Sequence, residues 1–467
     1  MNMPGRPKNA SPATAAERMA AFAHALAWRD IPSDVRELAR LHLADAIGVG
    51  LAASRVPAHR DFLGRLLAQV PPAGRATVLG LDGPVAADTA ALANGTSMHS
   101  LEYDDTHMRS IVHGSAVIVP PVLAVAQERN LPLTDVLRLT VAGWELLVRL
   151  GQAAAGAFQR RGFQVTSVGG AVVAAMLAAA ARGADPATMA RAGGIAGSQA
   201  SGIFEFLSDG SNVKALHPGW AAHAGVWAAS LAMAGMTGPL SVLEGKHGVY
   251  AAYADDRAAG QRLQAELDSL GSTWVLREAA FKFYPCCHYI HPYLEAAARL
   301  REQAAAAGQR IVSAHCGVAP GAGLVVAEPW QRKQAPRDTN DAKYSLPYCV
   351  ALALLDLPID VAAMTAGPLN QQALRLAADI GASAWEDSGF PARFGADLSV
   401  TLADGRVLRE RIDQVMGSAE RPATAAQVQG KFLRNASLAM TDAEARQLWR
   451  ALQDGDTMPT LAGVSHS

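Results

Sequence analysis

The stretch TSVGGAVVAAMLAAAARGADP, residues 166–186, decides the class of fold. It is almost wholly apolar from Val168 to Ala181, and Gly183 follows at a position where helices commonly end. A helix that is apolar on every face has to be buried on every side. The stretch HPGWAAHAGVWAASLAMAGMTGP, residues 217–239, has the same character, and its small residues permit close packing between helices. Both stretches predict a compact body of many helices.

The rest of the chain divides into three parts by its pattern. Alanine- and leucine-rich sequence, with Gly or Pro at helix-length intervals, predicts an all-helical segment over residues 1–273. Strand-like runs separated by helices predict a smaller α+β unit over residues 274–420, and LSVTLADGRVLRERI, residues 398–412, alternates as a hairpin does. Residues 421–467 are helical again. We therefore expect a mainly α protein whose large all-helical domain, built from both chain ends, carries an inserted α+β domain.

Composition and charge argue against several classes of protein. The chain has 467 residues, 50% of them hydrophobic and only 18% charged, which predicts a large core and a subunit interface. Its net charge of −1 provides no long-range field for nucleic acid or anionic lipid. Four cysteines are too few to cross-link so long a chain, which favours a reducing compartment. Because Glu17 and Arg18 stand where a signal peptide needs apolar residues, we expect a cytoplasmic protein without nucleic-acid or membrane partners.

Motifs for common cofactors are absent from the sequence. It contains no G-x-G-x-x-G, no G-x-x-x-x-G-K-[ST], no H-E-x-x-H and no G-x-S-x-G. Cys286 and Cys287, with His288 and His291 after them, are metal-ligand types, but adjacent cysteines match the spacing of structural zinc sites poorly. We therefore expect no cofactor and no metal ion.

Ionisable residues gather in four segments. In the first, three carboxylates, a threonine and a histidine lie within about a dozen residues: Glu102, Asp104, Asp105, Thr106 and His113. A solvated loop would explain such a run, but a histidine at the mouth of an apolar helix can also exchange a proton near neutral pH. In the second, Lys214 and His217 precede an apolar helix. This lysine needs an anion, which is either Asp209 or Glu205 or a substrate carboxylate.

The third segment begins at Lys282 and contains Cys287, His288 and His291 just before a helix. An anion at that helix N-terminus would meet free backbone N–H groups as well as the lysine. A tight turn whose cysteines and aromatic residues simply pack is the alternative.

The fourth segment contains Tyr344 and Tyr348, which are four residues apart on a predicted helical face. Either tyrosine can offer a hydroxyl to a ligand, but such a segment taken alone more often packs in the core. Gln164, before the apolar helix, either caps that helix or points into a cavity. We expect His99 to be a structural histidine.

Together these segments suit one chemistry better than others. Lys214, Lys282 and the histidines can hold the charges of a di- or tricarboxylate, for which a protein of net charge −1 must concentrate its positive groups locally. A positioned acid/base pair would then move a proton at a carbon next to a carboxylate. Loss of a hydroxyl group, loss of CO₂ and return of the proton to the other face all follow from that one intermediate.

Seven ordered strings resemble the MmgE/PrpD family: AALANGTSMHSLEYDDTH, HGSAVIVPPVLA, GGAVVAAMLAAAARG, DGSNVKALHPGWAAHAGVWAA, GPLSVLEGKHGVYAAYAD, FKFYPCCHYIHPYLEAA and DAKYSLPYCVALAL. The resemblance extends from about residue 15 to about residue 455. It implies an all-helical domain with an inserted α+β lid domain, a homodimer and no cofactor. It also implies 2-methylcitrate dehydratase, cis-aconitate decarboxylase or iminodisuccinate epimerase activity.

The resemblance also assigns site residues. As catalytic residues it implies His113, Asp104, Lys214, Lys282 and Tyr348. As substrate-binding residues it implies Glu102, Asp105, Thr106, Gln164, His217, Cys287, His288 and His291. Where decarboxylase-like members have a histidine, this chain has Gln164, and the histidine after the lid lysine aligns with Cys287 or His288. We therefore expect a citrate-type dehydratase first, with an epimerase, a decarboxylase or a non-catalytic carboxylate-binding protein as alternatives.

Overall fold

The computed structural model describes residues 12–461, so the ends of the predicted first and last segments lie outside the described residues. The protein is mainly α, as predicted, with a few small sheets. The helices of the N-terminal part are α1 (Ala15–Ala25), α2 (Ser33–Ala53), α3 (Pro57–Leu67), α4 (Ala87–Ser100), α5 (Gly114–Arg129), α6 (Leu133–Ala153), α7 (Ala157–Arg160), α8 (Val165–Ala181), α9 (Pro186–Gly197), α10 (Phe206–Asp209), α11 (Leu216–Met233) and α12 (Ala259–Leu267). A 3-10 turn, η2 (Asn212–Ala215), leads into α11.

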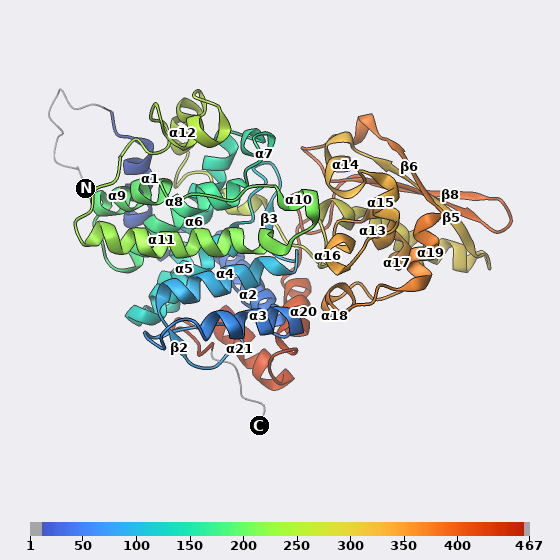
Figure 1. Ribbon diagram of the computed structural model, residues 1–467, viewed down its shortest axis with the longest axis horizontal. Helices are drawn as coiled ribbons and strands as arrows, with labels where there is room; N and C mark the ends of the chain where they lie inside the picture. Colours follow the sequence, from blue (N-terminus) through green and yellow to red (C-terminus); the bar gives the residue numbers. More distant parts are fainter. Residues whose placement is uncertain (1–11, 462–467) are drawn as a thin grey trace.

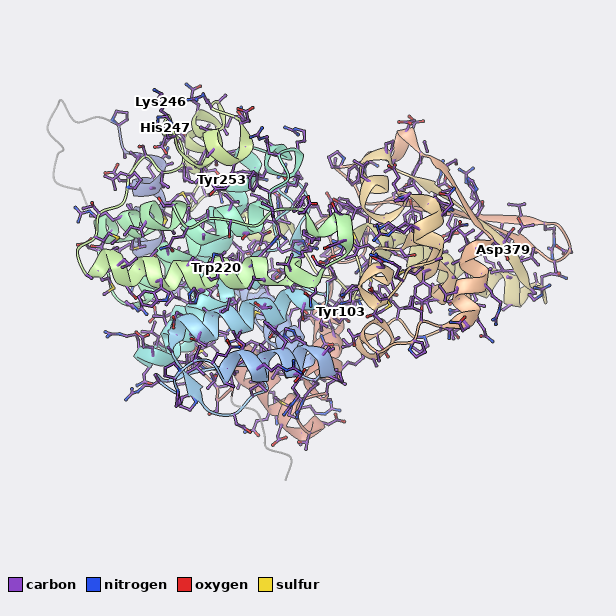
Figure 2. The ribbon with its side chains drawn as sticks, viewed as in Figure 1. Tyr103, Trp220, Lys246, His247, Tyr253 and Asp379 are labelled. Carbon is purple, nitrogen blue, oxygen red and sulfur yellow. The ribbon has the colours of Figure 1, made fainter. Side chains whose placement is uncertain are left out.

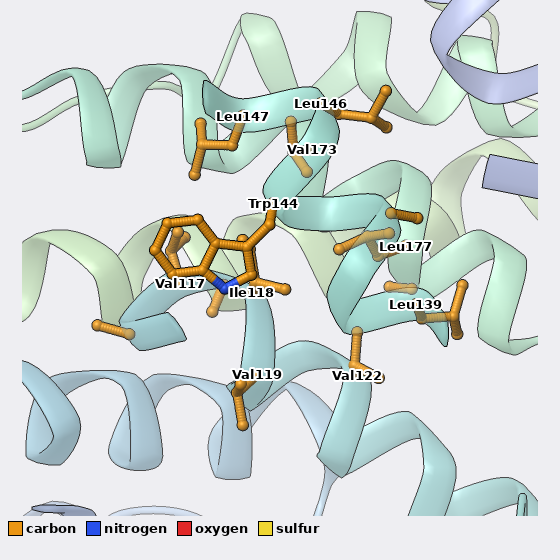
Figure 3. Packing of buried hydrophobic residues seen from close by; sticks show 14 of the residues in the cluster. Val117, Ile118, Val119, Val122, Leu139, Trp144, Leu146, Leu147, Val173 and Leu177 are labelled. Carbon is orange, nitrogen blue, oxygen red and sulfur yellow. The ribbon is translucent and has the colours of Figure 1, made fainter. Parts of the chain in front are cut away.

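The apolar helix predicted from residues 166–186 is α8, and it lies at the centre of this helical body. Almost all of its residues are buried. Trp144 of α6 lies among side chains of α5 and α8 in the same core (Figure 3). Small residues bring helices together as predicted: a Cβ built on Gly225 of α11 would stand 2.6 Å from the Cβ of Ala174 in α8.

The later part of the chain begins as an α+β unit. Its helices are α13 (His291–Ala306), α14 (Pro320–Val326), α15 (Trp330–Gln334), α16 (Thr339–Ala342), α17 (Leu346–Leu354), α18 (Val361–Thr365) and α19 (Gln371–Ala378). Its strands β5 (Ile311–Val318), β6 (Ile380–Ala384), β7 (Ala396–Leu402) and β8 (Val407–Ile412) form one sheet in the order β6-β5-β7-β8. The predicted hairpin is β7 and β8, which pair antiparallel.

The chain then returns to the helical body through α20 (Ala425–Ala436) and α21 (Asp442–Asp454), which pack beside α2 (Figure 1). Buried apolar residues of both chain ends share one core cluster, and those of residues 286–412 form another. We call residues 286–412 the α+β unit. That this unit is a lid domain, and that its boundaries lie at residues 273 and 420, stay predictions.

The structure also has two short strand pairs. The strands β1 (Ala76–Thr77) and β2 (Pro84–Val85) pair antiparallel, as do β3 (Thr106–His107) and β4 (Ala279–Ala280). The second pair fastens the acidic loop after α4 to the segment that leads into the α+β unit. None of the helices in residues 12–461 has both the length and the apolar composition that a bilayer crossing requires.

Candidate active site

The acidic loop between α4 and α5 carries the first site residues. It is held by the pairing of Thr106 in β3 with Ala280 in β4, which also brings Lys282 beside it. Glu102 has a φ of +53°, a left-handed conformation that is uncommon for residues with a side chain and is often found at functional sites. Figure 2 shows Tyr103 of this loop where the helical body meets the α+β unit.

Two lysines, the partly buried Lys214 and the buried Lys282, meet the carboxylate of Glu102. Lys214, from η2, donates to one oxygen, and the Nζ of Lys282 lies 3.4 Å from the other. Burial acts to raise the pKa of Glu102, but the two ammonium groups hold it well below its ordinary value. Burial acts in the opposite direction on Lys282, whose pKa the carboxylates of Glu102 and Asp104 nevertheless raise. Glu102 and Lys282 are therefore both charged at neutral pH.

A histidine pair shares the second carboxylate of the loop. Oδ2 of Asp104 lies 2.8 Å from Nδ1 of His99 and 3.2 Å from Nδ1 of His113, and Oδ1 lies 3.9 Å from Nζ of Lys282. Because a carboxylate only accepts hydrogen bonds, both Nδ1 atoms carry their protons here. Nε2 of His113 is then a proton acceptor, since burial lowers the pKa of this histidine to about 4 although Asp104 opposes the shift.

Gln164, whose side-chain amide does not titrate, lies between the imidazoles of His99 and His217 and contacts both. Its Nε2 lies 3.3 Å from Nε2 of His99, and its Oε1 lies 2.7 Å from Nδ1 of His217. With Nδ1–H of His99 directed at Asp104, the amide donates to His99 and accepts from His217. Gln164 therefore sets the tautomer of His217, whose pKa burial lowers to about 4.

A cavity of about 600 Å³ opens onto this cluster between the helical body and the α+β unit. His99, Glu102 and Lys214 line it from the helical body, while Lys343 and Tyr344 line it from the α+β unit. The volume falls within the range of small-molecule sites, about 300–1,000 Å³. A small anion in this cavity would meet His99, Glu102 and Lys214, behind which Asp104, His113 and Lys282 lie.

The structure brings together most of the residues predicted for the site. In the cluster lie Glu102, Asp104, His113, Gln164, Lys214, His217 and Lys282. The anion beside Lys214 is Glu102 rather than the predicted Asp209 or Glu205. Cys287 is buried nearby, and burial raises the pKa of its thiol to about 11.

Other predicted residues lie away from the cluster or face elsewhere. Asp105 accepts from His42 and from Ser115, so it holds α2 and α5 rather than a ligand. Oγ1 of Thr106 reaches only to 3.5 Å from Nδ1 of His113. His288, in a 3-10 turn, and His291, the first residue of α13, are both buried. Nε2 of His291 lies 3.2 Å from the carbonyl oxygen of Cys286.

The tyrosine at the site is Tyr344 and not the predicted Tyr348. The helix α17 begins at Leu346, after the N-cap Ser345, so the two tyrosines do not share a helical face. The hydroxyl of Tyr344 accepts from Nζ of Lys214 at 3.0 Å, whereas that of Tyr348 accepts from the backbone N–H of Asn370 inside the α+β unit. Ser345 is a typical N-cap residue, so the sequence could have indicated that the helix begins after it and that Tyr344 lies in the preceding turn.

Sequence reasoning also missed two further residues. His99 was predicted to be structural, yet it joins Asp104 to Gln164 inside the cluster. Lys343 was assigned no role, yet it lines the cavity. The ligand atoms of His99, Asp104 and His113 lie within 4.8 Å of one another, which is close enough for a metal ion. Their arrangement, two imidazoles on one carboxylate oxygen, also serves proton transfer.

Comparison with known proteins identifies the relatives of this chain. The cis-aconitate decarboxylase of Aspergillus terreus (strain NIH 2624 / FGSC A1156) is 30% identical over 294 residues, which are 60% of this chain and 59% of the relative. The match thus spans about three fifths of that relative's length. The cis-aconitate decarboxylase of Homo sapiens is 28% identical over 363 residues, 74% of this chain and 72% of the relative.

Family models match most of the chain. The model of the MmgE/PrpD N-terminal domain matches residues 17–262, and that of the MmgE/PrpD C-terminal domain matches residues 284–454. These two ranges contain Glu102, Asp104, His113 and Lys214, while Lys282 lies between them. The chain belongs to the MmgE/PrpD family.

Proposed function

We propose that this chain is a cofactor-independent lyase that moves a proton at a carbon next to a carboxylate of a small di- or tricarboxylate. The observation that carries the proposal is the carboxylate of Glu102 held by Lys214 and Lys282 within reach of the Asp104–His113 pair. Two ammonium groups that hold one carboxylate can hold that of a substrate in its place. Glu102 and Lys214 line the cavity.

The mechanism follows from the charges of the cluster. Lys214 and Lys282 bind the substrate carboxylate and stabilise the negative charge that develops when the neighbouring carbon loses its proton. Nε2 of His113 takes that proton, and Asp104 stabilises the imidazolium that forms. His113 then returns the proton to the leaving hydroxyl group, which departs as water and leaves a carbon–carbon double bond.

We place dehydration of a citrate-type hydroxy acid first. One acid/base group suffices for this elimination when it takes the proton and delivers it to the neighbouring hydroxyl group, and Gln164 cannot act as a second one. Decarboxylation is the second candidate, favoured by the matches to cis-aconitate decarboxylases. In that reaction the same lysines would bind the carboxylate that stays.

Proton NMR in D₂O tests the proposal. The purified protein is incubated with 2-methylcitrate, citrate, cis-aconitate and iminodisuccinate in separate samples. Deuterium entering a carbon next to a carboxylate supports the proposed proton transfer, and the product distinguishes dehydration, decarboxylation and epimerisation. Four unchanged spectra, combined with a raised melting temperature in the presence of these acids, would instead favour the non-catalytic carboxylate-binding protein.

The pH dependence of kcat/KM follows from the lowered pKa of His113. A base must be unprotonated, so the rate falls only as the pH drops through about 4. We expect kcat/KM at pH 5.5 to stay above about four fifths of its value at pH 7, after correction for the ionisation of the substrate. If the base were a histidine with an ordinary pKa of about 6.5, kcat/KM at pH 5.5 would be only about a tenth of its value at pH 7. Such a loss would contradict the assignment.

We also propose that the protein is a homodimer, in keeping with the resemblance. Trp220 and Trp227 are 41% and 49% exposed on the outer face of α11, where Figure 2 shows Trp220. Light scattering is expected to give a mass twice that of the 48.8 kDa chain. Trp227→Glu, which puts a charge into the proposed interface, should reduce the measured mass to that of one chain. Val407→Glu, at an exposed apolar residue of β8, is the control and should leave the dimer intact. A monomeric wild type would contradict the proposal.

We further predict a cytoplasmic location, no nucleic-acid or membrane partner, and no metal ion or cofactor.

A further inference from the structure

Lys343 is a buried cation on the cavity wall that the mechanism does not use. It lies in the turn between α16 and α17, is 5% exposed and lines the cavity together with Glu102 and Lys214. Its Nζ donates to the carbonyl oxygen of Ser100 at 3.1 Å. Among residues 12–461, no carboxylate oxygen lies within 4.0 Å of this ammonium group.

The other cations of the cavity are placed differently. Lys214 is paired with Glu102, and Arg332 lies 3.3 Å from Asp341. Lys333 donates to a backbone carbonyl, as Lys343 does, but it is half-buried and keeps contact with water. Lys343 therefore combines deep burial with the lack of a carboxylate partner in the described part of the chain.

Physical chemistry makes this arrangement costly without an anion. An ammonium group has three N–H donors, and the contact with Ser100 occupies one of them. Burial is the main reason why the pKa of Lys343 falls to about 8, and the charge of Lys214 lowers it further, while Glu102 and Asp338 oppose the shift. At pH 7 the group is still mostly protonated, so the cavity wall presents a charge to whatever fills the cavity.

Part of the role of Lys343 is structural. Ser100 is the last residue of α4, and a lysine at the carbonyl end of a helix is favourable. That contact requires only one donor and does not explain why the side chain lines a cavity that also holds Lys214.

We propose that Lys343 binds a second carboxylate of the substrate, so that the site selects di- and tricarboxylates over monocarboxylates. This inference rests on the proposed function, in which Lys214 and Lys282 bind the first carboxylate. The second carboxylate lies on the side of the cavity formed by the α+β unit, where Lys343 and Tyr344 stand. The helical body and the α+β unit thus each contribute a cation to one ligand.

Binding of two probes by the full chain tests the inference. Affinities for propane-1,2,3-tricarboxylate and for butyrate are measured by NMR titration at pH 7. Lys343→Met is expected to lower the affinity for the tricarboxylate about tenfold or more, and that for butyrate less than twofold. Lys214→Met should lower the affinity for both probes. Lys333→Met, which removes a charge from the same cavity, is the control and should change each affinity by less than threefold.

The outcomes separate the inference from the proposed function. If the tricarboxylate binds the wild type and Lys343→Met leaves the ratio of the two affinities unchanged, Lys343 only caps α4 and the inference fails alone. If the tricarboxylate does not bind the wild type, the proposed function fails and the inference fails with it.

A measurement on the wild type covers the case in which Lys343→Met does not fold. The preference for the tricarboxylate is expected to fall about tenfold between pH 7 and pH 9, as a lysine with a pKa of about 8 loses its charge. Glu102, which faces Lys343, keeps its charge over this range because its pKa lies well below its ordinary value, and His59, with a pKa of about 4, stays neutral. A preference that stays constant to pH 9 would overturn the inference.

Discussion

The His113→Ala variant is expected to lose a hundredfold or more of kcat/KM. Its imidazole is held by Asp104 through Nδ1 at 3.2 Å, which leaves Nε2 to accept the substrate proton. Positioned acid/base groups contribute about 10²- to 10⁴-fold to the rates of such reactions. The loss is measured with the substrate that exchanges deuterium in the NMR assay, and it should appear mainly in kcat, because alanine removes a transition-state interaction.

Two further variants complete this experiment. His223, on α11, hydrogen-bonds the carbonyl oxygen of Asp88 away from the cluster, so His223→Ala should change kcat/KM by less than twofold. Lys214→Ala removes a ligand of the substrate carboxylate and should cost a hundredfold or more as well. If kcat/KM falls less than threefold in both His113→Ala and Lys214→Ala, the cluster is not the catalytic site.

The Lys431→Met variant is expected to lower the free energy of unfolding by about 3–5 kcal/mol. Lys431, on α20, is fully buried, and its Nζ lies 2.7 Å from an oxygen of Asp45 on α2 and donates to the carbonyl oxygen of Tyr103. Methionine fills a similar volume but leaves Asp45 without its cation. Burial already raises the pKa of Asp45 to about 6 in spite of the lysine, so an unpaired carboxylate there is strongly unfavourable.

Urea unfolding measures this loss. Lys246→Met, at the exposed lysine labelled in Figure 2, is the control and should change the free energy by less than about 0.5 kcal/mol. The double variant Lys431→Met/Asp45→Asn should regain part of the stability, since it no longer buries a lone charge. A single variant as stable as the wild type would mean that the pair does not hold the acidic loop.

Several local features could be predicted from the residues alone. Helix α8 and the hairpin of β7 and β8 are confirmed, because each depends on a periodic pattern within one short segment. Lys214 and Lys282 stood out because a charge beside apolar sequence requires a partner. Their partner was predicted among neighbours in the chain, yet Glu102 is 112 residues away from Lys214.

Errors arose where a turn decides the direction of a side chain. Tyr344 and Tyr348 were assigned to one helical face, but the helix begins only after Ser345, so one tyrosine faces the cavity and the other the interior of the α+β unit. The start of a helix is uncertain by a residue or two in any sequence, and an error of that size turns a side chain to another face.

The sequence by itself determined the mainly α fold, the α8 core helix, the hairpin and the family, because ordered motifs and apolar periodicity are local properties. Only the tertiary structure decided which charges meet. It placed Glu102 between two lysines, His99 on Asp104, and Lys431 under the acidic loop. The energy of a buried charge depends on every group within a few ångströms, whatever its distance along the chain, and only the folded protein specifies those groups.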